Sequence, residues 1–122
     1  MLRAGLEAVA YRLALLREAL RERVPEAATI VASGRAIAES PTFARIVCDV
    51  LGEPLHVSLF PESSSRGAAL LAAEAAGVLP GIELPAPDWK VLEPDPTNAA
   101  IYREAMARQR DLERRLGLEG RG

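Results

Sequence analysis

The chain has 122 residues, of which 49% are hydrophobic, 26% charged and 4% aromatic, with a formal net charge of -2. This composition is typical of a globular protein with a single core, and it excludes collagen-like, disulfide-framework and long disordered chains. The charge balance lacks the basic footprint of a nucleic-acid-binding protein, and the single cysteine, Cys48, excludes an internal disulfide and a multi-cysteine metal site.

The sequence contains neither a membrane-spanning segment nor a signal peptide, and this suggests where the protein is located. No apolar run approaches the roughly 20 residues that a membrane-spanning helix needs. The first residues, 1–7, include an early acid and no continuous apolar core of a signal peptide. We therefore expect a cytoplasmic protein without a membrane partner.

The segment 2–24 is predicted to form an amphipathic helix. Its apolar residues recur at steps of three and four and line one face: Leu2, Leu6, Val9, Leu13, Leu16 and Leu20. Pro25 ends the helix, because a proline disfavours the helical conformation of the residue before it. We expect this face to pack on a sheet or on another helix. A dimeric coiled coil is the weaker alternative, because the pattern covers only about three heptads.

Two short strands are predicted. Residues 28–32 form a β-branched apolar run that stops at the turn residues 33–34, which indicates a buried and parallel strand. Residues 55–59 alternate and form the second strand. His56 faces the side opposite to its neighbours, and a lone histidine of this kind is more often a surface or packing residue than a catalyst.

Two helices flank the second strand. The first is predicted over 41–51, where Ser40 caps the free amides and Gly52 ends the helix in a left-handed conformation. The second is predicted over 66–76, an alanine-rich stretch with high helix propensity. The three serines at 63–65 fit a helix cap better than a nucleophile, because no histidine partner or nucleophile-elbow motif accompanies them.

The last third of the chain is predicted to be irregular and then helical. Residues 78–96 hold five prolines and should wrap the surface without regular structure. A final helix is expected over 97–116. Trp89 and Tyr102 are interpreted as anchors of these two segments.

The order of these elements predicts an α/β fold, with short parallel strands flanked by helices and joined by right-handed crossovers. Two strands are too few for a stable sheet. We therefore expect the chain to be incomplete as a domain. One face of the strands that contain Ile30 and Val57, which further strands would cover, should be apolar and exposed. Such a surface drives association, so a homo-oligomer is expected.

Four blocks of this sequence, in consistent spacing, resemble one family. They are LEAVAYR at 6–12, ASGRA at 32–36, SPTFARIVCDVLGEPL at 40–55 and ESSSRGAALLA at 62–72. The chain is similar over at least residues 6–77 to the C-terminal end of the FGGY carbohydrate kinases. That family shows a Gly-Gly loop, a Ser-Pro-x-Trp helix start, Ala-Asp-x-Leu-Gly and Glu-x-Ser-x-x-Gly-Ala-Ala-x-Leu-Ala. Within the family, the motifs resemble those of gluconate kinases and xylulokinases.

The resemblance implies the C-terminal portion of an actin-like (ribonuclease H-like) ATPase domain. Such kinases move the γ-phosphoryl group of ATP, with Mg²⁺, to a sugar hydroxyl, and an aspartate acts as the general base. The family's catalytic aspartate motif and phosphate loops match no part of this sequence, so the chain alone is expected to be inactive. Asp49 falls on the Ala-Asp-x-Leu-Gly block, which is a structural position. No catalytic or metal-binding residue is predicted.

The resemblance also implies which residues lie against the adenine and ribose of ATP or ADP: Ser33, Gly34, Arg35, Ala36 and Ser40. A glycine loop permits close approach of the backbone to a ligand. Arg35 stands where a second glycine is usual, and the loop before Ser40 is one residue longer. Two interpretations of Arg35 stay open. Its guanidinium stacks on the base or pairs with a phosphate, or it is a solvated surface group.

Two functions follow from this sequence. In the first, the chain supplies the adenine side of the ATP site of a gluconate or xylulose kinase and works with the remainder of the kinase chain. In the second, it is a small helical interaction module that oligomerises through residues 2–24 and has no catalytic role.

Overall fold

The computed structural model describes residues 1–24, 29–60, 62–79 and 88–118. Within these ranges the chain forms five helices and three strands, in the order α1 Leu2–Arg23, β1 Ile30–Ala32, α2 Arg35–Ala38, α3 Pro41–Leu51, β2 Leu55–Ser58, α4 Ser63–Ala75, β3 Trp89–Leu92 and α5 Pro96–Arg115. The bounds of α3 equal the predicted ones, and α1 and α5 differ from the prediction by one residue at the ends. The helix expected at 66 begins at Ser63. The strand expected over 28–32 spans Ile30–Ala32, and residue 28 lies outside the described ranges.

The sheet has three strands in the order β1-β2-β3. β1 and β2 are parallel, with Ala32 opposite Val57, and β3 is antiparallel to β2, with Trp89 opposite Ser58. The prediction of an irregular segment over 78–96 was therefore wrong for β3. The prolines around it concealed four residues that alternate between the two faces of the sheet, whereas residues 80–87 lie outside the described ranges.

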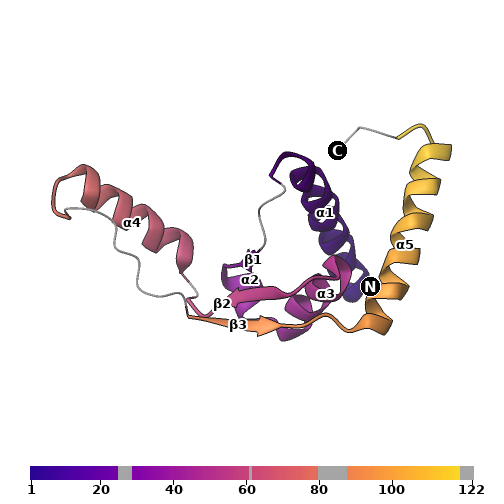
Figure 1. The fold of residues 1–122 in the computed structure, drawn as a ribbon, viewed down its shortest axis with the longest axis horizontal. Helices are drawn as coiled ribbons and strands as arrows, with labels where there is room; N and C mark the ends of the chain where they lie inside the picture. Colours follow the sequence, from indigo (N-terminus) through magenta and orange to yellow (C-terminus); the bar gives the residue numbers. More distant parts are fainter. Residues whose placement is uncertain (25–28, 61, 80–87, 119–122) are drawn as a thin grey trace.

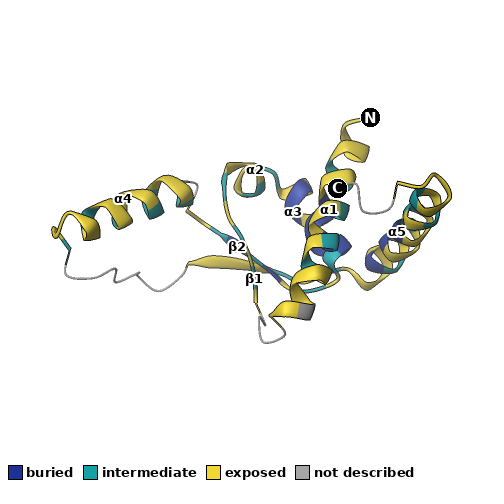
Figure 2. Ribbon diagram, turned by 90° about the horizontal axis from the view of Figure 1, so that it is seen from above, coloured by how far each residue is buried: buried dark blue, intermediate teal, exposed yellow. Residues whose placement is uncertain are grey.

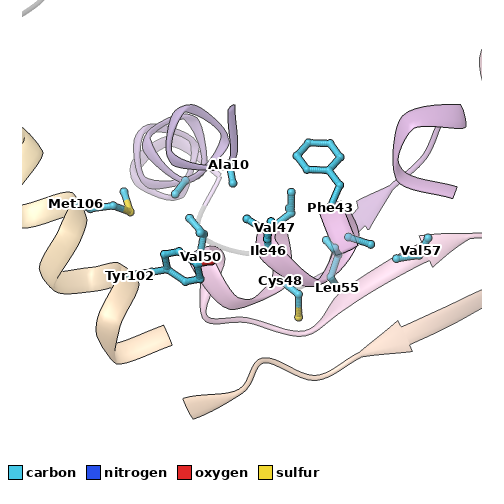
Figure 3. Close-up of a cluster of buried hydrophobic side chains, with 12 residues drawn as sticks. Ala10, Phe43, Ile46, Val47, Cys48, Val50, Leu55, Val57, Tyr102 and Met106 are labelled. Carbon is cyan, nitrogen blue, oxygen red and sulfur yellow. The ribbon is translucent and has the colours of Figure 1, made fainter. Parts of the chain in front are cut away.

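Helix α3 lies at the centre of the fold. It covers one face of the sheet, and both α1 and α5 pack against it (Figure 1). Figure 3 shows side chains from these elements meeting around α3. The buried apolar cluster consists of Ala10, Ala14, Phe43, Ala44, Ile46, Val47, Cys48, Val50, Leu55, Val57, Tyr102 and Met106. The sequence between Ser40 and Gly52 specifies this helix well, because the Ser40 hydroxyl accepts a hydrogen bond from the Phe43 amide and Gly52 adopts the left-handed conformation.

The buried face of α1 is not the predicted one. Ala10 and Ala14 are 0% and 6% exposed, whereas Leu16 and Leu20 of the predicted face are 60% and 55% exposed. Figure 2 shows the exposed side of α1 in yellow. The spacing of the leucines predicted the helix correctly, but alanines allow the α1 backbone to approach α3 more closely than leucines would. Leu6 of the predicted face does pack against the buried cluster. The other members of that face, which we call the α1 stripe, are exposed: Leu2, Val9, Leu13, Leu16 and Leu20.

The two faces of the sheet differ in exposure. Ile30 and Val57 point toward α3, and Val57 is only 7% exposed. On the other face, Val31 and Val91 are 48% and 45% exposed. Helix α4 stands apart from the rest of the chain (Figure 1), and none of its residues is buried.

One buried carboxylate joins α3 to the start of α5. Asp49 is 2% exposed, and its Oδ1 accepts a hydrogen bond from the Asp95 amide at 2.8 Å. Its Oδ2 accepts from the Asn98 side-chain amide at 3.0 Å. Asp95 in turn caps α5 by accepting from the Thr97 and Asn98 amides. Asp49 therefore has a structural role, as predicted from its position.

We expect Asp49→Ala to lower the free energy of unfolding by about 3 kcal/mol, because two donors lose a charged acceptor and Asp95 N–H is left without a protein partner. Urea unfolding measures this value. Asp111→Ala is the matched control, since Asp111 is an exposed carboxylate paired only within α5. The Asp111→Ala substitution should lower the free energy of unfolding by at most about 0.5 kcal/mol. Equal losses in the two variants would contradict the structural role of Asp49.

Candidate functional site

The carboxyl ends of β1 and β2 define one edge of the sheet, since these two strands are parallel. Ligands of open α/β sheets bind outside the carboxyl ends of the strands. The residues after β1 and after β2 both lie at this edge. The five predicted nucleotide-binding residues belong to the segment after β1 or to the start of α3.

Gly34 has a backbone conformation that is open to glycine alone. Its φ of 101° and ψ of 158° fall in a region that residues with a Cβ essentially never occupy. A Cβ built at this position would meet nothing within 4 Å, so the space above the residue is open. Close approach of a ligand to the backbone is thus sterically possible at Gly34. The next four residues form the short helix α2, which the sequence did not predict.

Arg35 has two carboxylate partners. Its Nη2 lies 2.5 Å from Glu62 Oε1, and its Nε lies 3.7 Å from Glu39 Oε1. Glu62 directly precedes α4, so this ion pair links the segment after β1 with the segment after β2. Arg35 was expected either to contact the nucleotide or to be a solvated surface group. Its guanidinium is exposed, but it is also held by a carboxylate from another segment, which neither interpretation includes. No sequence pattern indicates this pair, since its members are 27 positions apart.

The other three predicted residues have simpler environments. The Ser40 hydroxyl is engaged as the cap of α3, where it accepts from the Phe43 amide at 3.3 Å. Ser33 and Ala36 are exposed. None of the five predicted residues lines the apolar pocket next to them, which Ile37 and Ala38 of the same segment do line.

A pocket of about 320 Å³ adjoins these residues, between α2, α3 and the ends of β2 and β3. We call it the edge pocket. Its lining is mostly apolar: Ile37, Ala38, Pro41, Ala44, Val57, Leu59 and Leu92, with Ser58, Arg45 and Lys90 as polar members. Sequence reasoning missed these residues. The signal available was their closeness in sequence to the predicted residues, because Ile37 and Ala38 follow Ala36 directly.

The edge pocket combines apolar walls with two cationic side chains. Arg45 is half-exposed, donates from Nη1 to the Glu93 carbonyl at 2.5 Å, and lies 3.9 Å from Asp49 Oδ1. Lys90, the single lysine of the chain, is exposed on β3. Apolar walls with a few convergent polar groups are typical of sites for small organic ligands. This arrangement suits a flat apolar ring that carries an anionic group.

Three other residues are structural. His56 stacks on Trp89 with ring centroids 5.6 Å apart. Burial raises the pKa of the Cys48 thiol, which is 0% exposed and donates to the Leu92 carbonyl, so this cysteine is a packing residue. The prediction that the serines at 63–65 cap the helix was wrong: they lie within the first turn of α4, and Glu62 is its N-cap. The Ser63 hydroxyl instead donates to the Phe60 carbonyl at 2.8 Å.

Neither a metal cluster nor a membrane helix is found in the described ranges. No three His, Cys, Asp or Glu side chains there gather closely enough to hold a metal ion. No helix in those ranges is long and apolar enough to cross a bilayer.

The chain belongs to the FGGY family of carbohydrate kinases, because the model of the family's C-terminal domain matches residues 1–76. That match includes α1 through α4 and every predicted nucleotide-binding residue. It ends before β3 and α5.

Among solved structures, the crystal structure of xylulose kinase from Rhodospirillum rubrum is similar to this chain, with 26% sequence identity and a TM-score of 0.66. The match covers 94% of this chain and 24% of that kinase, so the chain spans about a quarter of the length of the kinase it resembles. The fold is accordingly that of the C-terminal portion of an actin-like ATPase domain.

We expect Gly34→Ala to lower the free energy of unfolding by about 1–3 kcal/mol, since the added Cβ forces the backbone out of a glycine-only conformation. Urea unfolding measures the change. Gly5→Ala is the control, because Gly5 lies within α1, has no neighbour within 4 Å of an added Cβ and does not have a positive φ. That control should be stabilised by about 0.5–1 kcal/mol. A neutral Gly34→Ala would show that the loop adopts another conformation in solution.

Proposed function

We propose that this domain supplies the adenine side of the ATP site of a carbohydrate kinase. The observation that carries the proposal is the edge pocket, an apolar cavity at the carboxyl ends of two parallel strands. It adjoins Gly34, whose open backbone permits a ligand to approach, in a chain of the FGGY family. The adenine ring would lie against Ile37 and Ala38. Lys90 and Arg45 would face the ribose and the phosphates.

The remaining steps of catalysis fall to residues outside these 122. Phosphoryl transfer needs a base for the sugar hydroxyl, and Mg²⁺ with phosphate-binding loops. ATP brings Mg²⁺ bound to its phosphates, and the described residues hold no acidic cluster that would bind the ion independently. On its own the chain is therefore expected to bind nucleotide without transferring phosphate. The partner is the remainder of a kinase in a reducing, cytoplasmic environment.

Xylulose is the favoured sugar, and gluconate is the alternative. The similarity to a xylulose kinase supports the first. The second rests on the sequence blocks alone. The sugar contacts are expected in the part of the kinase that this chain does not match.

A second candidate function, an interaction module without catalysis, is favoured by the α1 stripe. Its members Leu2, Leu16 and Leu20 are 82%, 60% and 55% exposed. An apolar surface along most of α1 is therefore not covered by any other part of the described ranges. Exposed apolar patches of this kind mark association surfaces. The same stripe would be covered by the remainder of a kinase if the first function holds.

We expect the isolated chain to form a homo-oligomer through the α1 stripe. Leu16→Glu with Leu20→Glu should shift it to a monomer at about 100 μM, since charge cannot be buried in such an interface without a partner. Sedimentation equilibrium measures the mass. Ile101→Glu, an equally exposed apolar position on α5, is the control and should leave the oligomer intact. A wild-type monomer at that concentration would contradict the expectation.

Nucleotide binding is the decisive experiment for the kinase function. Calorimetry with ADP should give weak binding, roughly millimolar, which corresponds to about 4 kcal/mol. Ala38→Phe should abolish it, because the added ring fills the edge pocket. Ala36→Phe is the matched control: it lies on the same short helix, is exposed, and does not line the pocket.

The variants also separate the two possible placements of adenine. Loss of binding in Ala36→Phe but not in Ala38→Phe would place the base on the loop after β1 rather than in the edge pocket. Arg35→Gly should weaken binding only if the Arg35–Glu62 pair holds the loop in the binding conformation. Absence of binding in the wild-type chain, together with a stable homo-oligomer, would favour the interaction module.

A further inference from the structure

A second groove lies at the opposite end of α3 from the edge pocket. It has a volume of about 330 Å³ and is bounded by the last turns of α1, the end of α3 and the middle of α5. We call it the arginine groove. Pro41 and Ala44 line the edge pocket, whereas Val50 and Leu51 line this groove. At 1.5 Å per residue, the two ends of the helix are about 15 Å apart.

The arginine groove carries an excess of positive charge. Its charged lining residues are four arginines and two glutamates: Arg17, Arg21, Arg103, Arg110, Glu18 and Glu53. The groove thus has two unbalanced positive charges, in a chain whose net charge is -2. An excess of this sign in a concave site favours an anionic ligand.

The ion pairs in the groove show how this excess is distributed. Glu53 is shared by two guanidinium groups, with Arg17 Nη2 at 3.2 Å and Arg21 Nη2 at 2.8 Å. Arg110 is paired with Glu18, both of whose oxygens accept from Nη2, at 2.7 and 2.8 Å. Arg103 has no ion-pair partner among the described residues. Its guanidinium is therefore available to bind an anion, whereas Glu53 in the same groove is already paired with two arginines.

The floor of the groove is apolar. Ala14, Val50 and Met106 belong to the buried cluster beneath it, and Leu51 and Ala107 complete the surface. The planar guanidinium of arginine binds carboxylate and phosphate groups bidentately, through two parallel N–H donors. An apolar floor adjacent to such donors fits the organic part of a phosphate ester.

We propose that the arginine groove binds a small phosphate monoester in its dianionic form. The phosphate is held by Arg103 and by the guanidinium groups of Arg110 and Arg21. The organic part lies over Met106. Two negative charges neutralise the excess of two positive ones. The site is separate from the edge pocket, so it does not depend on the proposed nucleotide function.

Phenyl phosphate at pH 8, where it is dianionic, is the probe, and ¹³C-methyl NMR of the full chain is the measurement. The chain has two methionines, and these report separately. Met106 lines the groove, whereas Met1 is fully exposed at the amino terminus. Phenyl phosphate should shift the Met106 methyl resonance in a saturable manner and leave Met1 unchanged. Benzyl alcohol, which lacks the charge, should shift neither.

Three variants test the role of the charges. Arg103→Gln should weaken binding about tenfold through the loss of one charge-assisted contact. Arg108→Gln, an exposed arginine on the same helix that is paired with Glu104 and lies outside the groove, should leave it unchanged. Glu18→Gln removes a competing carboxylate from Arg110 and should tighten binding about threefold. A destabilised variant would not bind more tightly, so this arm is independent of folding.

The opposite outcomes overturn the proposal. Equal weakening by Arg103→Gln and Arg108→Gln would assign the effect to the general surface charge. A Met106 resonance that does not move at saturating phenyl phosphate would exclude a ligand in the groove. Equal shifts with benzyl alcohol would make the site apolar rather than anion-binding.

Discussion

The whole arrangement depends on the burial of α3 between the sheet on one side and α1 and α5 on the other. Of its eleven residues, seven are buried, and the only charged one among them is Asp49. A carboxylate in such a place is tolerated only if it is hydrogen-bonded, and it receives donors from the segment that begins α5. The arginine groove depends on this contact, because the contact fixes the start of α5, which forms one wall of the groove.

The sequence was most informative where local chemistry decides the structure. A serine cap, an apolar face and a left-handed glycine specify α3 without help from distant residues, and its bounds were predicted without error. The leucine periodicity of α1 predicted a helix but chose the wrong face, because the choice depends on how closely α1 approaches α3. The sequence of α1 contains two apolar faces, one of leucines and one of alanines. Only the tertiary packing decides between them.

The features that the sequence did not predict depend on contacts between residues that are far apart in the chain. The family resemblance directed attention to the loop after β1, where Gly34 has a backbone conformation that residues with a Cβ essentially never adopt. It did not identify the edge pocket, whose walls come from four elements, nor β3, whose hydrogen-bond partners lie more than 30 positions away. The Arg35–Glu62 pair is of the same kind. Periodicity and capping describe neighbours along the chain, and they carry no information on such contacts.

The edge pocket, if it holds adenine, determines what this domain contributes to catalysis. Adenine lies far from the transferring phosphoryl group and does not change during the reaction. Contacts to it are equally strong in the ground state and in the transition state, so by themselves they lower KM without raising kcat. They accelerate the chemical step only when the γ-phosphate is fixed elsewhere, since the base must then be held at a defined distance from that group. In that case the domain would act as a positioning device, and its catalytic value would depend on rigid attachment to the residues that hold the phosphates. The α1 stripe, a long apolar surface without a partner in the described ranges, is well suited to such an attachment.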